Sequence, residues 1–178
     1  MRRKTRQVKV KDLIMGGGFP VSVQTMWKEP LTLPPANVCK RIKKFSSIGC
    51  DVVRFAVPKI EDATYVGNIA GSVTMPIVAD IHFDYRIALR CMDFPIAKIR
   101  INPGNIGSNR KVQQVIKKAM DHHIPVRIGV NSGSLPKSLL NEKNTAIAMV
   151  KAAEHELEIC EKYGFTAVSY THLRAHET

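Results

Sequence analysis

The stretch from Cys50 to Asp80 reads CDVVRFAVPKIEDATYVGNIAGSVTMPIVAD and contains one complete strand–helix–strand unit. Residues 50–57 form a short apolar run that Pro58 ends, and the spacing of apolar residues in 60–70 predicts a helix. Residues 76–80 form a second short apolar run. Two such runs joined by a helix favour parallel strands, because parallel strands are covered by helices and become apolar throughout.

The same unit repeats along the whole chain. The expected strands are 20–26, 50–57, 76–80, 97–102 and 124–130, with a sixth beginning near 164–168, and the expected helices are 36–48, 60–70, 85–92, 109–122 and 145–163. A doubly wound sheet could use this number of units, but no G-x-G-x-x-G or Walker loop follows the first strand. We therefore expect an α/β fold of the TIM (β/α)8-barrel type, truncated after about five and a half βα units, since a whole barrel needs about 250 residues.

Composition narrows the class of protein. The 178 residues carry 27 Lys and Arg against 15 Asp and Glu, and this net charge of +12 suits nucleic acid, an anionic membrane surface or small anions. Aromatic residues make up only 6%, so a nucleic-acid-binding module is disfavoured. No apolar run approaches the roughly 20 residues of a membrane-spanning helix, and the basic N-terminus lacks a secretory signal. We expect a cytoplasmic protein with neither a nucleic-acid nor a membrane partner.

The cysteines do not have the spacing of a metal site. Cys39, Cys50, Cys91 and Cys160 are scattered, with no C-x-x-C pair and no histidine at ligand spacing. We therefore expect reduced thiols that form no disulfide and hold neither zinc nor an iron–sulfur cluster.

Three arginines lie inside predicted strands. Arg54, Arg100 and Arg127 each stand among apolar residues. A guanidinium in such a place keeps its charge and loses its hydration, which costs free energy unless an anion compensates it. Each could pair with a core carboxylate, but the acid beside them is Asp80, which cannot neutralise all three. The pattern therefore favours a shared site for a strongly anionic ligand.

Hydrogen-bonding residues share the faces of these strands, because residues two apart in a strand point to the same side. Those that share a face with a strand arginine or with Asp80 are Asn102, Asn131 and His82. Arginine matches phosphate oxygens with two parallel hydrogen bonds, and asparagine can orient phosphates or hydroxyls. The tight loop predicted at 103–107 could add backbone N–H groups. We predict that these groups meet at the carboxyl ends of the strands, where barrel enzymes bind their ligands.

Six strings of this chain occur together and in order. They are Arg3-Lys-Thr-Arg-Gln-Val-Lys-Val10, Val21-Ser-Val-Gln24, Cys50-Asp-Val-Val-Arg54, Val78-Ala-Asp-Ile-His-Phe-Asp-Tyr-Arg86, Lys98-Ile-Arg-Ile-Asn-Pro-Gly-Asn-Ile-Gly107, and Arg127-Ile-Gly-Val-Asn131 with Ser134-Leu135. Together they resemble the 4-hydroxy-3-methylbut-2-enyl diphosphate synthase family, also called GcpE. The resemblance runs from residue 2 to about residue 168.

This resemblance implies an oxidoreductase of non-mevalonate isoprenoid biosynthesis. Such an enzyme reductively opens 2-C-methyl-D-erythritol 2,4-cyclodiphosphate to 4-hydroxy-3-methylbut-2-enyl diphosphate. The resemblance also implies a [4Fe–4S] cluster in a smaller, later domain, flavodoxin or ferredoxin as electron donor, and a homodimer at full length. On matching positions it implies a diphosphate site in which Asp80 is a supporting residue and the binding residues are Arg54, His82, Arg100, Asn102, Arg127 and Asn131.

The chain departs from the family pattern at its end. The family's cluster cysteines, its essential glutamate and a lysine of the sixth strand are not found, so we expect no catalytic residue, no cluster ligand and no activity from this chain alone. Residues 169–178 show no apolar alternation, and we interpret them as a tail foreign to a barrel domain that spans 1–168. The 25–31 loop also differs from the usual family version, which leaves its ligand contacts open.

Two alternatives remain at this point. Another phosphate- or pterin-binding barrel of the dihydropteroate-synthase type would share the architecture and the polar strand ends. A fragment without function is the other, because an unfinished barrel leaves its first and sixth strands as open edges.

Overall fold

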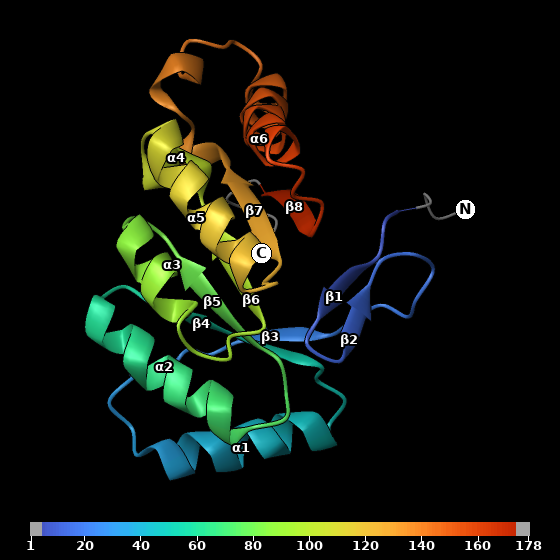
Figure 1. The fold of residues 1–178 in the computed structure, drawn as a ribbon, viewed down its shortest axis with the longest axis vertical. Helices are drawn as coiled ribbons and strands as arrows, with labels where there is room; N and C mark the ends of the chain where they lie inside the picture. Colours follow the sequence, from blue (N-terminus) through green and yellow to red (C-terminus); the bar gives the residue numbers. More distant parts are fainter. Residues whose placement is uncertain (1–4, 174–178) are drawn as a thin grey trace.

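In the computed structural model the chain is organised around a six-stranded parallel sheet (Figure 1). The structure describes residues 5–173, with the backbone alone at positions 103, 104, 137 and 171–173. The strands pair in chain order, each with its neighbour in sequence: β3 (Gln24–Met26), β4 (Val52–Ala56), β5 (Ile77–Ile81), β6 (Lys98–Ile101), β7 (Val126–Asn131) and β8 (Val168–Leu173). This order, with a helix between strands, is that of a (β/α) barrel and confirms the expected fold class.

Helices cover one face of the sheet. They are α1 (Pro35–Ser47), α2 (Ile60–Ser72), α3 (Tyr85–Cys91), α5 (Asn109–Asp121) and α6 (Thr145–Lys162), with the short α4 (Pro103–Ile106) and two 3-10 turns, η1 (Ser132–Ser134) and η2 (Lys137–Leu139). Alternate strand residues such as Phe55, Ile99 and Ile128 are fully buried against these helices in one apolar core. The other strand residues therefore face the concave side, which becomes the place for polar groups.

Local sequence explains where the helices begin and end. Pro35 stands in the first turn of α1, where its missing N–H is harmless, and Gly49 follows the helix with a φ of 89°. Asp84 caps α3 by accepting a hydrogen bond from the Arg86 backbone N–H at 2.9 Å. These signals lie in the sequence, and the helices accordingly fall within one or two residues of the expected ranges. Among the described residues no helix is long and apolar enough to cross a bilayer.

A hairpin that was not expected precedes the sheet. β1 (Val8–Val10) and β2 (Leu13–Met15) pair antiparallel, and Figure 1 shows them on the other side of the sheet from α2 and α3. Val8 and Val10 pack with Ala97, just before β6, and the Lys11 ammonium donates to the Val73 carbonyl at 3.0 Å. Because both contacts lie just ahead of strands, the hairpin closes the amino end of the sheet.

The structure corrects the start of the first strand and agrees with the expected start of the sixth. The first was expected over 20–26 but begins at Gln24, since Val21 is 65% exposed and Val23 is 55% exposed. The sixth was expected to begin near 164–168, and β8 begins at Val168, runs to Leu173 and pairs with the whole of β7.

The sixth strand thus extends past residue 168, where the barrel domain was expected to end, into the first residues of the segment interpreted as a foreign tail. Ladder hydrogen bonds use the main chain, and the Val-Ser-Tyr-Thr sequence has enough β propensity to extend β7. The foreign origin of residues 169–178 stays a prediction, and residues 1–4 and 174–178 lie outside the described residues. The loop expected at 103–107 is also corrected, because residues 103–106 form α4.

Candidate functional site

The concave face of the sheet gathers charged residues from four neighbouring strands. Arg54 lies on β4, Asp80 on β5, Arg100 on β6 and Arg127 on β7, each at positions that alternate with residues of the apolar core. The strand register places Asp80 beside Arg100 and Arg100 beside Arg127. The three predicted arginines and the predicted acid thus lie on one surface.

Asp80 is the centre of this group. Its side chain is only 3% exposed, and its Oδ1 accepts from Arg100 Nη1 at 2.9 Å. Its Oδ2 lies 3.5 Å from Arg54 Nε and 3.5 Å from His82 Nε2. One carboxylate was not expected to neutralise all three arginines. In the structure Asp80 contacts two of them, Arg54 and Arg100. Its two oxygens thereby orient both guanidinium groups.

Gly129 makes room for Arg100. The Arg100 Nη2 donates to the Gly129 carbonyl at 3.3 Å, and a Cβ placed on Gly129 would lie 2.3 Å from Arg100 Nε. Glycine is therefore needed here because the guanidinium occupies the space that any side chain would take. The Arg100 side chain remains 12% exposed, so its outer edge faces the open concave side.

The two predicted asparagines are linked through Ser134. Asn102 follows β6, is 4% exposed, and donates from Nδ2 to Ser134 Oγ at 2.7 Å. Asn131 ends β7, where its Oδ1 accepts from the Gly133 N–H at 3.0 Å and its carbonyl lies 3.4 Å from Ser134 Oγ. Ser134 belongs to one of the strings given above, but the sequence did not assign it a role. Its position three residues after Asn131 was the signal that could have identified it as a site residue.

Arg127 lies level with Arg100, and Lys98 extends the group toward the amino ends of the strands. Burial lowers the pKa of Arg127, and the positive charges of Arg54 and Arg100 lower it further, while Asp80 acts in the opposite sense. Burial also lowers the pKa of Lys98 to about 8, with Arg127 as a second cause. Lys98 was missed in the sequence, although it stands two residues before Arg100 and therefore on the same face.

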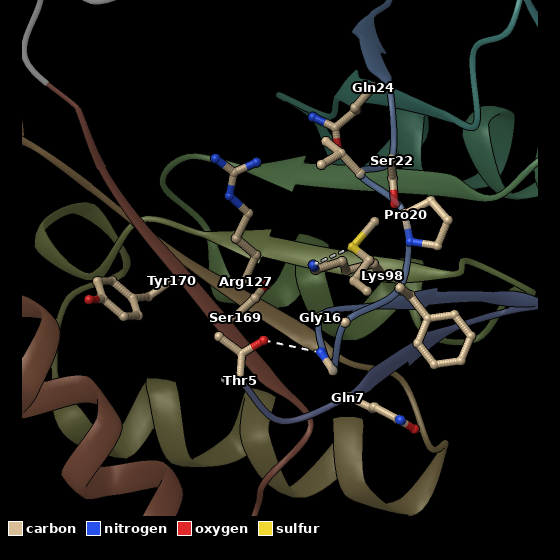
Figure 2. A pocket seen from close by; sticks show the side chains of 15 residues that line it. Thr5, Gln7, Gly16, Pro20, Ser22, Gln24, Lys98, Arg127, Ser169 and Tyr170 are labelled. Carbon is tan, nitrogen blue, oxygen red and sulfur yellow. Dashed lines mark hydrogen bonds between the residues drawn. The ribbon is translucent and has the colours of Figure 1, made fainter. Parts of the chain in front are cut away.

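A cavity of about 850 Å³ opens beside Lys98 and Arg127. Figure 2 shows their side chains reaching into the space between strands β6 to β8 and the segment that follows β2. The described side chains of the concave strands thus combine four cations with the single carboxylate of Asp80. Such a surplus of fixed positive charge attracts phosphates and other small anions.

The described cysteines do not suit an iron–sulfur cluster. Burial raises the pKa of Cys91 and that of Cys160 to about 12, so these thiols stay protonated. Within residues 5–173 no group of three or more His, Cys, Asp and Glu side chains could hold a metal ion. A cluster would need ligands other than these.

Fold and site together define a domain of the (β/α)-barrel class whose concave face carries an excess of positive charge. The family follows from sequence: a family model described as the GcpE TIM-barrel domain matches residues 5–177, and the chain belongs to this family. The resemblance derived from the strings is thereby confirmed.

Curated relatives agree with this assignment. The 4-hydroxy-3-methylbut-2-en-1-yl diphosphate synthase (flavodoxin) of Treponema denticola is 45% identical, covering 88% of this chain and 46% of the relative. The synthase of the same name from Clostridium perfringens is 45% identical over 92% of this chain and 47% of the relative. The chain thus spans about half the length of these relatives.

Solved structures with a similar backbone include dihydropteroate synthases. The Vibrio fischeri enzyme has a TM-score of 0.66 at 10% identity and covers 93% of this chain and 66% of that chain. The Yersinia pestis enzyme has a TM-score of 0.67 at 10% identity and covers 92% of this chain and 61% of that chain. At this identity the likeness concerns the fold alone, so the dihydropteroate-synthase alternative is not favoured.

Proposed function

We propose that this chain is the substrate-binding barrel part of a 4-hydroxy-3-methylbut-2-enyl diphosphate synthase. The reaction would be the two-electron reductive opening of 2-C-methyl-D-erythritol 2,4-cyclodiphosphate. The observation that carries the proposal is the concave group, in which Asp80 contacts Arg54, His82 and Arg100. It supports the proposal because a diphosphate needs several oriented cations at once.

Each residue of the site has a distinct task in this proposal. Arg100 and Arg54, both oriented by Asp80, would bind phosphate oxygens with their outer N–H groups, and Arg127 would add a third cation. His82, whose side chain is 45% exposed, would donate a hydrogen bond to the ligand. Asn102 and Asn131 would orient the remaining oxygens from the ends of β6 and β7. Asp80 stays a supporting residue, since its oxygens already face cations.

The remaining parts of the reaction lie beyond these residues. Electrons would come from flavodoxin, the donor named for the relatives, or from ferredoxin, through a [4Fe–4S] cluster whose ligands are not among the described residues. We also propose a cytoplasmic protein that works as a homodimer when the complete enzyme is formed. On this view the chain by itself binds substrate without turning it over.

A chimera tests the proposed function. Residues 5–168 would replace the matching part of the Treponema denticola synthase, so that everything else comes from that enzyme. With reduced flavodoxin under anaerobic conditions, we expect conversion of the cyclodiphosphate. A folded chimera that binds no cyclodiphosphate by calorimetry would contradict the proposal.

Substitution of Arg100 in this chimera tests the clamp. Arg100→Lys keeps the charge but loses the planar fork, so we expect weaker binding of the cyclodiphosphate. Loss of a charged hydrogen bond costs roughly 1.5–3 kcal/mol, which is about one to two powers of ten in affinity. The control is Arg86→Lys, because Arg86 pairs with Asp84 at the exposed start of α3. Equal affinity in the two variants would remove Arg100 from the site.

A further inference from the structure

We propose that Ser134 is a positioning residue of the site, which fixes the orientation of the Asn102 amide and joins the ends of β6 and β7. This deepens the proposed function and rests on it, because Asn102 is one of the residues proposed to bind the cyclodiphosphate. Ser134 would act through Asn102 rather than by touching the substrate.

The Asn102 side chain has two orientations to choose from. The residue follows β6, is 4% exposed, and its main-chain carbonyl accepts from the N–H groups of Asn105 and Ile106, both at 3.1 Å. The backbone is therefore fixed at the start of α4. The terminal amide can still rotate by half a turn, which exchanges its donor nitrogen with its acceptor oxygen. A neighbouring group must select one orientation if a ligand is to meet the same atoms each time.

The Ser134 hydroxyl makes this selection. Its Oγ accepts from Asn102 Nδ2 at 2.7 Å and lies 3.4 Å from the main-chain carbonyl oxygen of Asn131. A carbonyl only accepts, so the single hydroxyl hydrogen of Ser134 is directed to Asn131. Ser134 then accepts from Asn102, which turns Nδ2 toward Ser134 and Oδ1 away from it. This contact uses one of the two N–H groups of the amide, so it orients the side chain without using all of its hydrogen-bonding groups.

The turn that carries Ser134 is held by contacts within the chain. Asn131 Oδ1 accepts from the Gly133 N–H at 3.0 Å, which closes the turn at η1. Leu135, the next residue after Ser134, packs against the main apolar core. The hydroxyl is therefore in place before any ligand arrives. A group that is oriented in advance binds its ligand without an added cost of ordering.

The same contact connects two neighbouring strands of the site. Asn102 follows β6 and Ser134 follows β7, and a second side-chain contact between these strands runs from Arg100 Nη2 to the Gly129 carbonyl at 3.3 Å. Arg100 and Asn102 are two residues apart and share a face. The two contacts together keep this arginine and this asparagine in a fixed relation to β7.

Calorimetry of the 178-residue chain with the cyclodiphosphate tests the role of Ser134. We expect Ser134→Ala to weaken binding about three- to tenfold, the range of one neutral hydrogen bond. Ser134→Thr keeps the hydroxyl and should restore most of the affinity. The control is Ser132→Ala in the same turn, because the described residues give the Ser132 hydroxyl no hydrogen bond. Unchanged affinity in folded Ser134→Ala, or an equal loss in Ser132→Ala, would overturn the proposal.

A double-mutant cycle separates orientation of Asn102 from general support of the turn. In the Asn102→Ala background, Ser134→Ala should cost no further affinity, because the side chain that it orients is gone. The same fold-loss in both backgrounds would show that Ser134 acts independently of Asn102, and the proposal would fail.

A measurement on the wild type does not depend on the folding of any variant or on the substrate. NMR of the ligand-free chain should show a nuclear Overhauser contact between the Nδ2 hydrogens of Asn102 and the Cβ hydrogens of Ser134, and a missing contact would overturn the proposal. If the wild type bound no cyclodiphosphate, the proposed function would fail. In that case an Asn102 amide signal that shifts in Ser134→Ala and returns in Ser134→Thr would still establish that Ser134 orients Asn102.

Discussion

The two ends of the concave face differ in the groups that contact their buried positive charges. Toward the carboxyl end, Arg100 and Arg54 meet the carboxylate of Asp80, and a glycine carbonyl completes the contact. Toward the amino end, Lys98 faces a thioether and an open cavity. In the first arrangement the positive charge is compensated without a ligand, and the contacts mainly fix the orientation of the guanidinium groups. In the second, no described carboxylate contacts the Lys98 ammonium, so a bound anion should change the free energy of unfolding far more.

The largest effect should follow from removing the shared carboxylate. Asp80→Asn leaves the two guanidinium groups buried without their counter-ion, so we expect the free energy of unfolding to fall by about 3–5 kcal/mol. Urea denaturation followed by circular dichroism would measure this. Asp84→Asn is the matched control, because Asp84 forms a similar pair with Arg86 at the surface, where such pairs contribute about 0–1 kcal/mol. Equal losses in the two variants would show that Asp80 does not have the central role.

A smaller loss should follow from removing one cation of the compensated end. Arg100→Met deprives Asp80 of its contact at 2.9 Å while Arg54 remains at 3.5 Å, so we expect a loss of about 2–4 kcal/mol without ligand. The sequence alone left open whether this arginine served a ligand only, in which case apo stability would hold or rise. Thermal unfolding without ligand separates these outcomes, and an undiminished stability would mean that the Asp80 contact contributes nothing.

The space at Gly129 offers a more local test. Gly129→Ala places a methyl group against the Arg100 guanidinium and should displace it from Asp80, with a loss of about 1–3 kcal/mol. Gly71→Ala in α2 is the control, since its Cβ would find only Pro95 Cγ at 3.7 Å and an alanine favours the helix by about 0.5–1 kcal/mol. If Gly129→Ala were as stable as Gly71→Ala, the steric argument for this glycine would fail.

The smallest effect should have the opposite sign and concerns the amino end. Lys98→Met removes a buried ammonium, so we expect the ligand-free protein to gain about 1–2 kcal/mol at pH 7. In the wild type, the pKa of Lys98 falls from 10.5 when unfolded to about 8 when folded. Between these values the unfolded chain holds more protons, so wild-type stability rises with pH and the gap to the variant narrows. A gap that stays constant from pH 7 to 10 would assign the gain to packing instead.

Sequence patterns predicted the repeating units well, because they have strong local signals. Pro58 ends a strand, Gly49 ends a helix, and apolar spacing separates the helical stretches from the strands. The hairpin β1–β2 lacked such signals. It turns at Lys11 with a φ of 57°, without the Asn-Gly pair typical of hairpins, and its strands are only three residues long.

The candidate site was predicted to different degrees at its two ends. An arginine in an apolar strand is conspicuous, and alternation then located its neighbours such as Asn102. The split of Asp80 between two arginines was not accessible, because it depends on strand register and side-chain rotamers. Lys98 was missed since a lysine at the start of a strand is usually solvated, whereas here it is 4% exposed and contacts Met15 of the hairpin, which was not predicted.

The sequential pairing of β3 through β8 also has a consequence for how the chain folds during synthesis. Each strand finds its partner in the preceding unit, so every newly made βα unit can dock as it emerges. The N-terminal hairpin is the exception. It is made first, yet its anchors at Val73 and Ala97 arrive more than sixty residues later. The segment that is synthesised first is therefore among those that reach their final contacts late. The amino end of the sheet is covered only after the chain has been made as far as Ala97.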